Sequence, residues 1–547
     1  MIDYCYLFAV LLLLFSCIGS SVTPQGYIQQ YDHNERTTEG TFGMNISILL
    51  IVRAISVSGG DISILQEVLY MRSRGINVAI AVPAESHPEK LTEFIHSVGN
   101  FSSTTYNDMI LTYSGKCCFP NTPSEELIRL ASSYDVVVAT LFTTVSAVQH
   151  IASRHSHILP AYYVQDYEPW FLCSPYQCLT TIRKFSDYWT PRERSRRRSV
   201  EFCRTTYTYG VSGQAGIPMH MFAKTNWLVS MVRDMHGTHV HKVAPSIDHS
   251  VFHPPSQYAH PPHDPHEVRG WEEVQVTPIH TSPNNPAAAV KVVAMIRPRT
   301  PRRNALHCLD VMLRLARYSF NQHSHTHTSF LPIHVTLFGA PVEDIRSLVS
   351  SLRHTLGPAD HRNVSVLDAH NVFVLGVVRE RQRLADLFRQ SDIFLDMSWW
   401  QAFGRTGVEA MACGCLAIMP SIGAAPEICE SPHSDLASCL YHDGNDIDGV
   451  FTKVLGLAQN HTLRMDIARR GIRRAFGFTL EQSTQSIVTS LHEGLLLHRQ
   501  RVPTFQGNNM MWSRENAKWC IVISSGLVLF ILVRIWGKGR FSMKRQA

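Results

Sequence analysis

The segment 391–427 constrains the fold of this chain more than any other stretch of its sequence. An apolar run at 393–397 predicts a buried strand, and Phe403-Gly404 then predicts a turn into a helix that carries Glu409. Such a unit directs free backbone N–H groups and the positive end of a helix dipole at one point, where a phosphate can bind. One turn into the helix, Glu409 is placed to accept hydrogen bonds from two neighbouring hydroxyls, as on a ribose. The alternative is an ordinary β-α-β unit without a ligand.

The rest of the chain repeats this alternation of strand and helix in two series, and 547 residues with 45% hydrophobic side chains suffice for two cores. Alternation of this kind predicts an α/β protein with two doubly wound, Rossmann-like parallel sheets. The strands are expected at 46–52, 78–82, 134–139, 161–164 and 206–211, and then at 290–296, 335–339, 372–375, 393–397 and 416–419. We expect an N-terminal domain at 44–245, a Pro- and His-rich linker and insertion at 246–290, a C-terminal domain at 291–478 and a final helix at 479–500.

The turn after the first predicted strand reads Val57-Ser58-Gly59-Gly60 and precedes a helix expected at 62–74. It lacks the G-x-G-x-x-G spacing of dinucleotide-binding domains, so a hydride-transferring oxidoreductase is disfavoured. Two readings of Gly59 and Gly60 remain open, a backbone approach to a bound diphosphate and a plain helix N-terminus.

Several motifs in the same order resemble the family 4 (group 1) glycosyltransferases of the GT-B fold. They comprise the segment 391–427, the entry into the second domain at 226–228, 244–248 and 252–254, and the run Arg297-Pro-Arg-Thr-Pro-Arg302. The segments 163–170 and 297–304 look most like the transferases of bacterial rhamnan synthesis. The resemblance covers residues 45–495 and implies a retaining hexosyl- or deoxyhexosyltransferase that uses a nucleotide-activated sugar. It implies a glycan, glycolipid or glycoprotein acceptor.

The same resemblance implies roles for individual side chains. Arg297 and Arg302 would hold the donor diphosphate and stabilise the leaving group, with Arg302 in place of the usual Lys and Arg303 as its substitute. Further donor-binding positions would be Gly59, Gly60, Gly376, Val377, Phe403, Gly404, Arg405 and Thr406, with Gln401 and Glu409 in the catalytic set and Gln165 and Asp166 on the acceptor side. No metal is expected, because arginine supplies the positive charge and Asp446 and Asp448 lie in a loop-like Gly/Asn context.

Two positions depart from the family pattern. Gln401 stands where relatives usually carry the first of two Glu residues, and Gln165 stands in place of a His that usually precedes Asp166. Amides still form hydrogen bonds with hydroxyls but do not ionise. A catalytically silent relative that binds sugar nucleotide or acts as a membrane scaffold is therefore the main alternative.

Both ends of the chain are apolar. Residues 1–21 predict a signal peptide or an anchor, and 519–536 predict a transmembrane helix. The basic tail at 537–547 is expected in the cytosol, which places the catalytic body in the lumen of the ER or Golgi. The sequons at Asn45, Asn100, Asn363 and Asn460 are compatible with that placement.

The remaining features carry less information. A net charge of +6 and the absence of a recognisable basic module give no support to nucleic-acid binding. The basic run 191–198 is either a solvated loop or a surface for anionic lipid or an anionic acceptor. Cys117 and Cys118, like Cys413 and Cys415, are expected as core or loop thiols, and the His-containing segment 321–328 as a polar loop.

Overall fold

The computed structural model describes residues 45–54, 59–85, 109–118, 121–172, 206–207, 217–255, 289–325, 332–355, 371–430 and 437–501. The expected signal or anchor, the expected transmembrane helix, the basic tail and the basic run 191–198 lie outside these residues, as does most of the expected insertion. Among the helices that the structure describes, none has the length and apolar character needed to cross a membrane.

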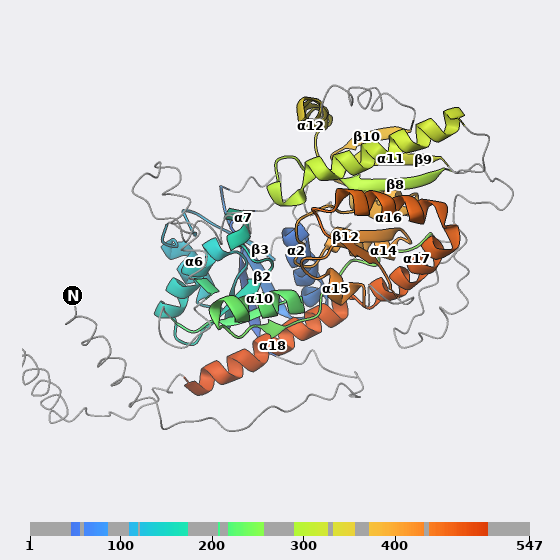
Figure 1. The fold of residues 1–547 in the computed structure, drawn as a ribbon. Coiled ribbons are helices and arrows are strands. Elements are labelled where there is room, and N and C mark those ends of the chain that lie inside the picture. The colour runs from blue at the N-terminus through green and yellow to red at the C-terminus, as the bar shows by residue number, and fades with distance from the viewer. Residues whose placement is uncertain are drawn as a thin grey trace, which may run out of the picture. The chain divides into compact units, whose positions relative to one another are not determined.

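The first domain is built on a parallel sheet of seven strands in the order β3-β2-β1-β4-β5-β6-β7. Its strands are β1 (Ser47–Ile51), β2 (Asn77–Pro83), β3 (Ile110–Tyr113), β4 (Val136–Ala139), β5 (Leu159–Val164), β6 (His220–Ala223) and β7 (His241–Lys242). Its helices are α2 (Gly59–Ser73), α5 (Glu125–Ala131), α6 (Phe142–Arg154), α7 (Pro169–Leu172) and α10 (Asn226–His236). These elements run from blue to green in Figure 1.

The second domain has a parallel sheet of six strands in the order β10-β9-β8-β11-β12-β13. Its strands are β8 (Val290–Met295), β9 (Ile333–Phe338), β10 (Val372–Gly376), β11 (Ile393–Leu395), β12 (Leu416–Pro420) and β13 (Leu440–His442). Its helices are η4 (Pro301–Arg303), α11 (Ala305–His325), α12 (Val342–Thr355), α13 (Arg381–Arg389), α14 (Arg405–Ala412), α15 (Ala425–Ile428), α16 (Ile447–Gln459) and α17 (His461–Phe476). Both sheets start from a central strand and reverse direction there, so the prediction of two doubly wound Rossmann-like domains is confirmed.

Alternate residues of the central strands enter different cores. Val292 and Leu395 pack on one face of the second sheet, whereas Val293 and Phe394 pack on the other. Because both faces are covered by helices, these strands read as nearly continuous apolar runs rather than as an alternating pattern. This apolar pattern is the reason that the strands could be predicted from the sequence.

The final helix, α18 (Leu480–Arg501), returns from the second domain to pack on α2, β5 and β6 of the first (Figure 1). Three serines on it make the connection. Ser483 donates to Glu67 at 3.0 Å, Ser486 accepts from the Ala244 backbone N–H at 2.8 Å, and Ser490 bonds the His220 ring at 2.8 Å. The chain after the second sheet therefore helps to hold the first.

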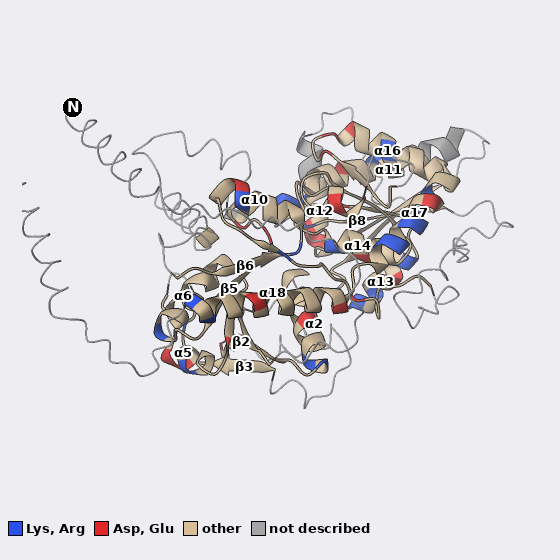
Figure 2. Ribbon diagram, turned by 90° about the horizontal axis from the view of Figure 1, so that it is seen from below, with Lys and Arg blue, Asp and Glu red and all other residues tan. Residues whose placement is uncertain are grey.

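Helix α17 carries the most conspicuous group of arginines in the described part of the chain, coloured blue in Figure 2. Several of them bind backbone carbonyls: Arg464 donates to Leu457, Arg470 to Ala437 and Arg474 to Glu427, over 2.7–3.0 Å. This basic helix thus binds α15, α16 and the segment before β13.

Gly59 and Gly60 are the first two residues of α2, which agrees with the helix N-terminus left open in the sequence analysis, although the helix starts three residues before the predicted residue 62. Two further predictions of local structure are wrong. Thr206 and Tyr207, expected to open a strand, have helical geometry. The segment 321–325, expected as loop, continues α11 to His325. Helix propensity of the preceding residues outweighed the polar composition there.

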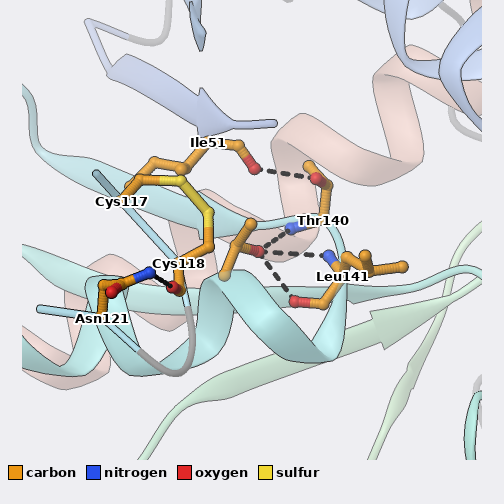
Figure 3. The surroundings of a disulfide bond; sticks show 7 residues. Ile51, Cys117, Cys118, Asn121, Thr140 and Leu141 are labelled. Carbon is orange, nitrogen blue, oxygen red and sulfur yellow. Dashed lines mark hydrogen bonds between the residues drawn. A yellow bond between two sulfur atoms is a disulfide. The ribbon is translucent and has the colours of Figure 1, made fainter. Parts of the chain in front are cut away.

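The thiol prediction for Cys117 and Cys118 is also wrong, because the two adjacent cysteines form a disulfide (Figure 3). They are buried in the first core, near the end of β1. There the Thr140 hydroxyl donates to the Ile51 carbonyl at 2.8 Å and joins β4 to β1. A second disulfide links Cys429 and Cys439, whereas Cys413 and Cys415 are buried free thiols as expected.

Candidate active site

A cavity of about 410 Å³ lies where the carboxyl ends of both sheets meet. From the first domain it is lined by residues that follow β1, β4, β5 and β6, and from the second by residues that follow β8, β9, β10 and β11. Ligands of doubly wound sheets bind at this edge, beside the point where the strand order reverses. The two switch points, between β1 and β4 and between β8 and β11, both open into this cavity.

The cavity brings together thirteen of the fourteen side chains or glycines that the sequence singled out as site residues. They are Gly59, Gly60, Gln165, Asp166, Arg297, Arg302, Val377, Gln401, Phe403, Gly404, Arg405, Thr406 and Glu409. Gly376 is not part of the lining; its carbonyl accepts the Gly339 N–H at 2.7 Å, and both glycines have positive φ. Gly376 thus shapes the loop that presents Val377.

Basic side chains outnumber acidic ones in the described lining, eight to four. The basic ones are Arg53, Lys224, Arg297, Arg302, Arg303, Arg379, Arg381 and Arg405, and the acidic ones are Asp61, Asp166, Glu168 and Glu409. A concave wall with this imbalance concentrates a positive potential and favours an anionic ligand.

Three arginines converge from the segment that joins β8 to α11. Burial and the neighbouring Arg302 lower the pKa of Arg297, and the same two causes lower the pKa of Arg303 to about 9. Among the described residues the Arg297 side chain forms no hydrogen bond or ion pair, and the buried Nε of Arg303 has no partner. An anion bound between these guanidinium groups would offset their mutual repulsion.

Behind the arginines lies Asp396, which directly follows β11 and is only 3% exposed. One carboxylate oxygen accepts from the backbone and hydroxyl of Ser398, at 3.0 and 2.5 Å. The other accepts from the Gln401 amide at 2.6 Å and from Arg303 at 3.4 Å. Asp396 falls within the strand expected at 393–397, so its role as a buried counter-ion was not predicted.

Gln401 is nearly buried between two charges. Its amide nitrogen faces Asp396 and Ser398, and its amide oxygen accepts from Arg302 at 3.4 Å. Its backbone is fixed as well, because Gln401 donates to the Ile422 carbonyl at 3.1 Å and accepts from the Ala424 N–H at 3.0 Å.

Glu409 lies one turn into α14, as the motif predicts, and is 5% exposed. It accepts from Arg405 at 2.8 Å and lies 3.7 Å from Arg381. Arg405 also donates to Ser63 and Gln66 on α2 of the first domain, with a distance of 2.6 Å to Ser63. The helix starts from Gly404 with φ of +76°, and Gly404, Arg405 and Thr406 at its N-terminus line the cavity.

On the first-domain side, Gln165 donates to the Thr140 carbonyl at 2.9 Å. A Cβ on Gly60 would lie 2.5 Å from the Gln165 side-chain oxygen, so this position of α2 accepts only glycine without rearrangement. Asp166 accepts from the Trp400 indole at 3.3 Å and lies 3.9 Å from Arg302. Burial raises the pKa of Asp166.

Glu168 is a second cavity carboxyl that sequence reasoning passed over, although it lies within the quoted motif 163–170. It is 1% exposed and accepts from the Tyr162 hydroxyl at 2.6 Å and from the Phe142 N–H at 2.7 Å. Burial raises its pKa to about 8. A shift in this direction favours the protonated form of the carboxyl. Its position two residues after Asp166 was the sequence signal that could have identified Glu168 as a site residue.

In the described part of the chain, no group of three or more His, Cys, Asp or Glu side chains is arranged to hold a metal ion. Asp446 caps α16 by accepting from the Gly449 N–H at 2.9 Å, and Asp448 pairs with Arg314 at 2.5 Å. The two aspartates thus lie at the start of a helix rather than in the expected loop.

Comparison with known proteins finds a family match within the second domain. Residues 343–460, from α12 to the end of α16, match the family model described as glycosyl transferases group 1. No curated protein matches the chain.

Solved structures share the two-domain fold at low identity. HepE of Anabaena in complex with UDP and glucose has 15% identity and a TM-score of 0.52, covering 82% of this chain and 100% of its own. A glycosyltransferase of Rickettsia africae has 13% identity and a TM-score of 0.52, covering 83% and 99%. Sucrose-phosphate synthase of Thermosynechococcus elongatus has 12% identity and a TM-score of 0.53, covering 83% and 98%. Residues 343–460 therefore carry a glycosyl transferase group 1 region within a chain that has the GT-B fold.

Proposed function

We propose that this protein is a glycosyltransferase that moves a sugar from a nucleoside diphosphate donor to the hydroxyl of an acceptor, with retention at the transferred carbon. The observation that supports it best is the convergence of Arg297, Arg302 and Arg303 at a cavity that is also lined by the N-terminus of α14. Few ligands other than a diphosphate would match three guanidinium groups and a helix N-terminus at once.

In this proposal the donor diphosphate lies against Arg297 and Arg302, and Glu409 accepts hydrogen bonds from the ribose. Loss of the nucleoside diphosphate develops negative charge, which the arginines and the helix dipole stabilise more strongly in the transition state than in the ground state. The departing phosphate oxygen takes the acceptor proton, so a strong protein base at position 165 or 401 is not needed. The positive charge comes from arginine, and we propose no metal.

The donor is expected to be a hexose or deoxyhexose nucleotide. HepE was solved with UDP and with UDP-glucose, which makes UDP the first probe to try. The likeness of segments 163–170 and 297–304 to rhamnan-synthesis transferases adds dTDP- and GDP-linked deoxyhexoses. The acceptor is proposed to be a glycan, glycolipid or glycoprotein.

We further propose that the body is lumenal and membrane-anchored, on the strength of the apolar ends and the basic tail. Two of the four sequons lie within the described residues, and both Asn45 and Asn460 are exposed. Protease treatment of intact microsomes should then remove only an epitope on the tail. If the body is digested and the tail survives, the orientation is the opposite of the one proposed.

The deciding experiment is nucleotide binding by the full-length protein, measured by thermal shift and calorimetry with UDP, GDP, dTDP and NAD. Arg297→Ala should weaken binding of the preferred nucleoside diphosphate roughly 10- to 150-fold, the equivalent of ~1.5–3 kcal/mol for a charge-assisted hydrogen bond. Arg299→Ala is the matched control. Its side chain is 83% exposed, pairs with Asp344 at 2.9 Å and does not line the cavity, so binding should be unchanged.

The catalytically silent alternative predicts the same binding without turnover, so donor hydrolysis and transfer must be measured on the same preparation. Equal affinity in Arg297→Ala and wild type, with folding intact, would remove the proposed diphosphate site. Binding of NAD alone would instead favour an oxidoreductase.

A further inference from the structure

The position that departs most from the glycosyltransferase pattern, Gln401, is set against a carboxylate that the pattern did not include. The Gln401 amide nitrogen lies 2.6 Å from a carboxylate oxygen of Asp396. Both side chains are almost fully buried, with exposures of 7% and 3%. The amide is therefore oriented by Asp396, with its nitrogen toward the carboxylate and its oxygen toward Arg302.

Asp396 is held in place from all sides. Ser398 gives it two hydrogen bonds, Arg303 lies 3.4 Å away, and its own backbone N–H donates to the Ile418 carbonyl at 2.9 Å. Its carbonyl is bonded by the His442 ring at 2.8 Å. A carboxylate fixed in this way by backbone and side chain cannot turn aside when a neighbour changes.

A second carboxylate at position 401 would meet this one at hydrogen-bond distance. Two buried carboxylates so close cannot both ionise, and one of them must hold a proton. The neutral amide avoids that conflict and still accepts a hydrogen bond from Arg302. The buried negative charge therefore stands on residue 396, and the residue beside the cavity is neutral.

We infer that Gln401 is a positioning residue: it connects the fixed charge of Asp396 to Arg302 and holds the Arg302 guanidinium toward the diphosphate position and Asp166. This inference rests on the proposed donor site. It explains the loss of the usual Glu as a transfer of charge within the site. The amide at 401 is then a requirement of an active site that contains Asp396, not a sign of lost activity.

The test uses four variants of the full-length protein and UDP as the probe, or whichever nucleoside diphosphate the wild type prefers. Gln401→Glu should weaken binding at least tenfold, because repulsion between the carboxyl groups at 396 and 401 would displace the side chain at 401 and, with it, the Arg302 guanidinium. Its affinity should also depend on pH near neutrality, since the carboxyl pair shares a proton. Gln401→Met, which removes all three side-chain hydrogen bonds without adding charge, should weaken binding by about three- to tenfold.

Combining Gln401→Glu with Asp396→Asn restores a single buried carboxylate, whose partner is now the Asn amide. This double variant should recover affinity to within about fivefold of wild type and lose the pH dependence of Gln401→Glu. Gln382→Glu is the control for the same chemical change. The Gln382 amide also donates to an aspartate, Asp386 at 3.3 Å, but it does so on the exposed surface of α13. Nucleotide binding by Gln382→Glu should therefore match that of wild type.

Wild-type affinity in both Gln401→Glu and Gln401→Met would overturn the inference. A double variant no better than Gln401→Glu, with both proteins folded, would do the same. If Gln401→Glu does not fold, recovery of folding and binding in the double variant supports the charge transfer, and failure of both contradicts it. Absence of nucleotide binding in the wild type would instead overturn the proposed function, which keeps the two failures apart.

Discussion

The loop that faces Gln401 depends on Gly423, and replacing this glycine with alanine should damage the donor side of the cavity. Gly423 has φ of +119°, a region that residues with a side chain rarely adopt. A Cβ at this position would lie 1.9 Å from the Gln401 carbonyl oxygen and 2.7 Å from its carbonyl carbon. Both are backbone atoms, so no side-chain rotation relieves the contact.

The magnitude follows from what must move. Holding alanine at positive φ costs about 1–2 kcal/mol. Separating the loop from Gln401 breaks two backbone hydrogen bonds, Gln401 to Ile422 and Ala424 to Gln401, at about 1 kcal/mol each. We therefore expect Gly423→Ala to lower the free energy of unfolding of the second domain by about 3–4 kcal/mol, and to weaken nucleotide binding through displacement of Gln401.

The assay is urea unfolding followed by circular dichroism, with nucleotide binding measured on the folded fraction. Gly456→Ala provides the control, because Gly456 lies in α16 with ordinary φ and a Cβ there would meet nothing within 4 Å. It should stabilise the protein by about 0.5–1 kcal/mol. If the midpoint urea concentration for unfolding of Gly423→Ala equals that of wild type, the steric reasoning is refuted.

Two further predictions concern pH. Burial raises the pKa of Glu168 from 4.5 in an unfolded chain to about 8, so stability falls as pH rises between these values. Glu168→Gln should remove this loss of stability and raise the melting temperature at pH 7.5 by several degrees. Calorimetry at a series of pH values measures both effects. Burial lowers the pKa of His220 to about 3 and of His241 to about 4, so the stability present above pH 6.5 is lost as pH falls toward these values. In urea unfolding at pH 4.5–6.5, His241→Gln should reduce the pH dependence of the free energy of unfolding by at most about 1.4 kcal/mol per pH unit.

The fold was largely accessible from the sequence because its strands are buried on both faces. Runs such as 46–52 and 290–296 are apolar except for one residue each, and their order with the intervening helices defines two doubly wound sheets. Local boundaries were less accessible. Nothing in composition distinguishes Gly59 as a turn residue from Gly59 as the first residue of α2.

The cavity lining was predictable where motifs follow strand ends, since parallel strands deliver such residues to one edge. The partners of those residues were not. Asp396 and Gln401 meet through the path of a short loop between β11 and α14, which no periodicity encodes. The need for glycine at 423 likewise arises from a loop-to-loop contact. The bond between Cys117 and Cys118 depends on backbone geometry that two adjacent letters do not reveal.

Turnover of a nucleotide sugar tests the central proposal most directly. Full-length protein is incubated with labelled UDP-glucose and with GDP- and dTDP-linked hexoses and deoxyhexoses, and release of the nucleoside diphosphate is followed with and without membrane extract as acceptor. The proposal predicts release from at least one donor, lowered tenfold or more in Arg297→Ala and unchanged in Arg299→Ala. No release from any donor by a protein that binds the nucleoside diphosphate, or equal release by Arg297→Ala and wild type, would contradict it.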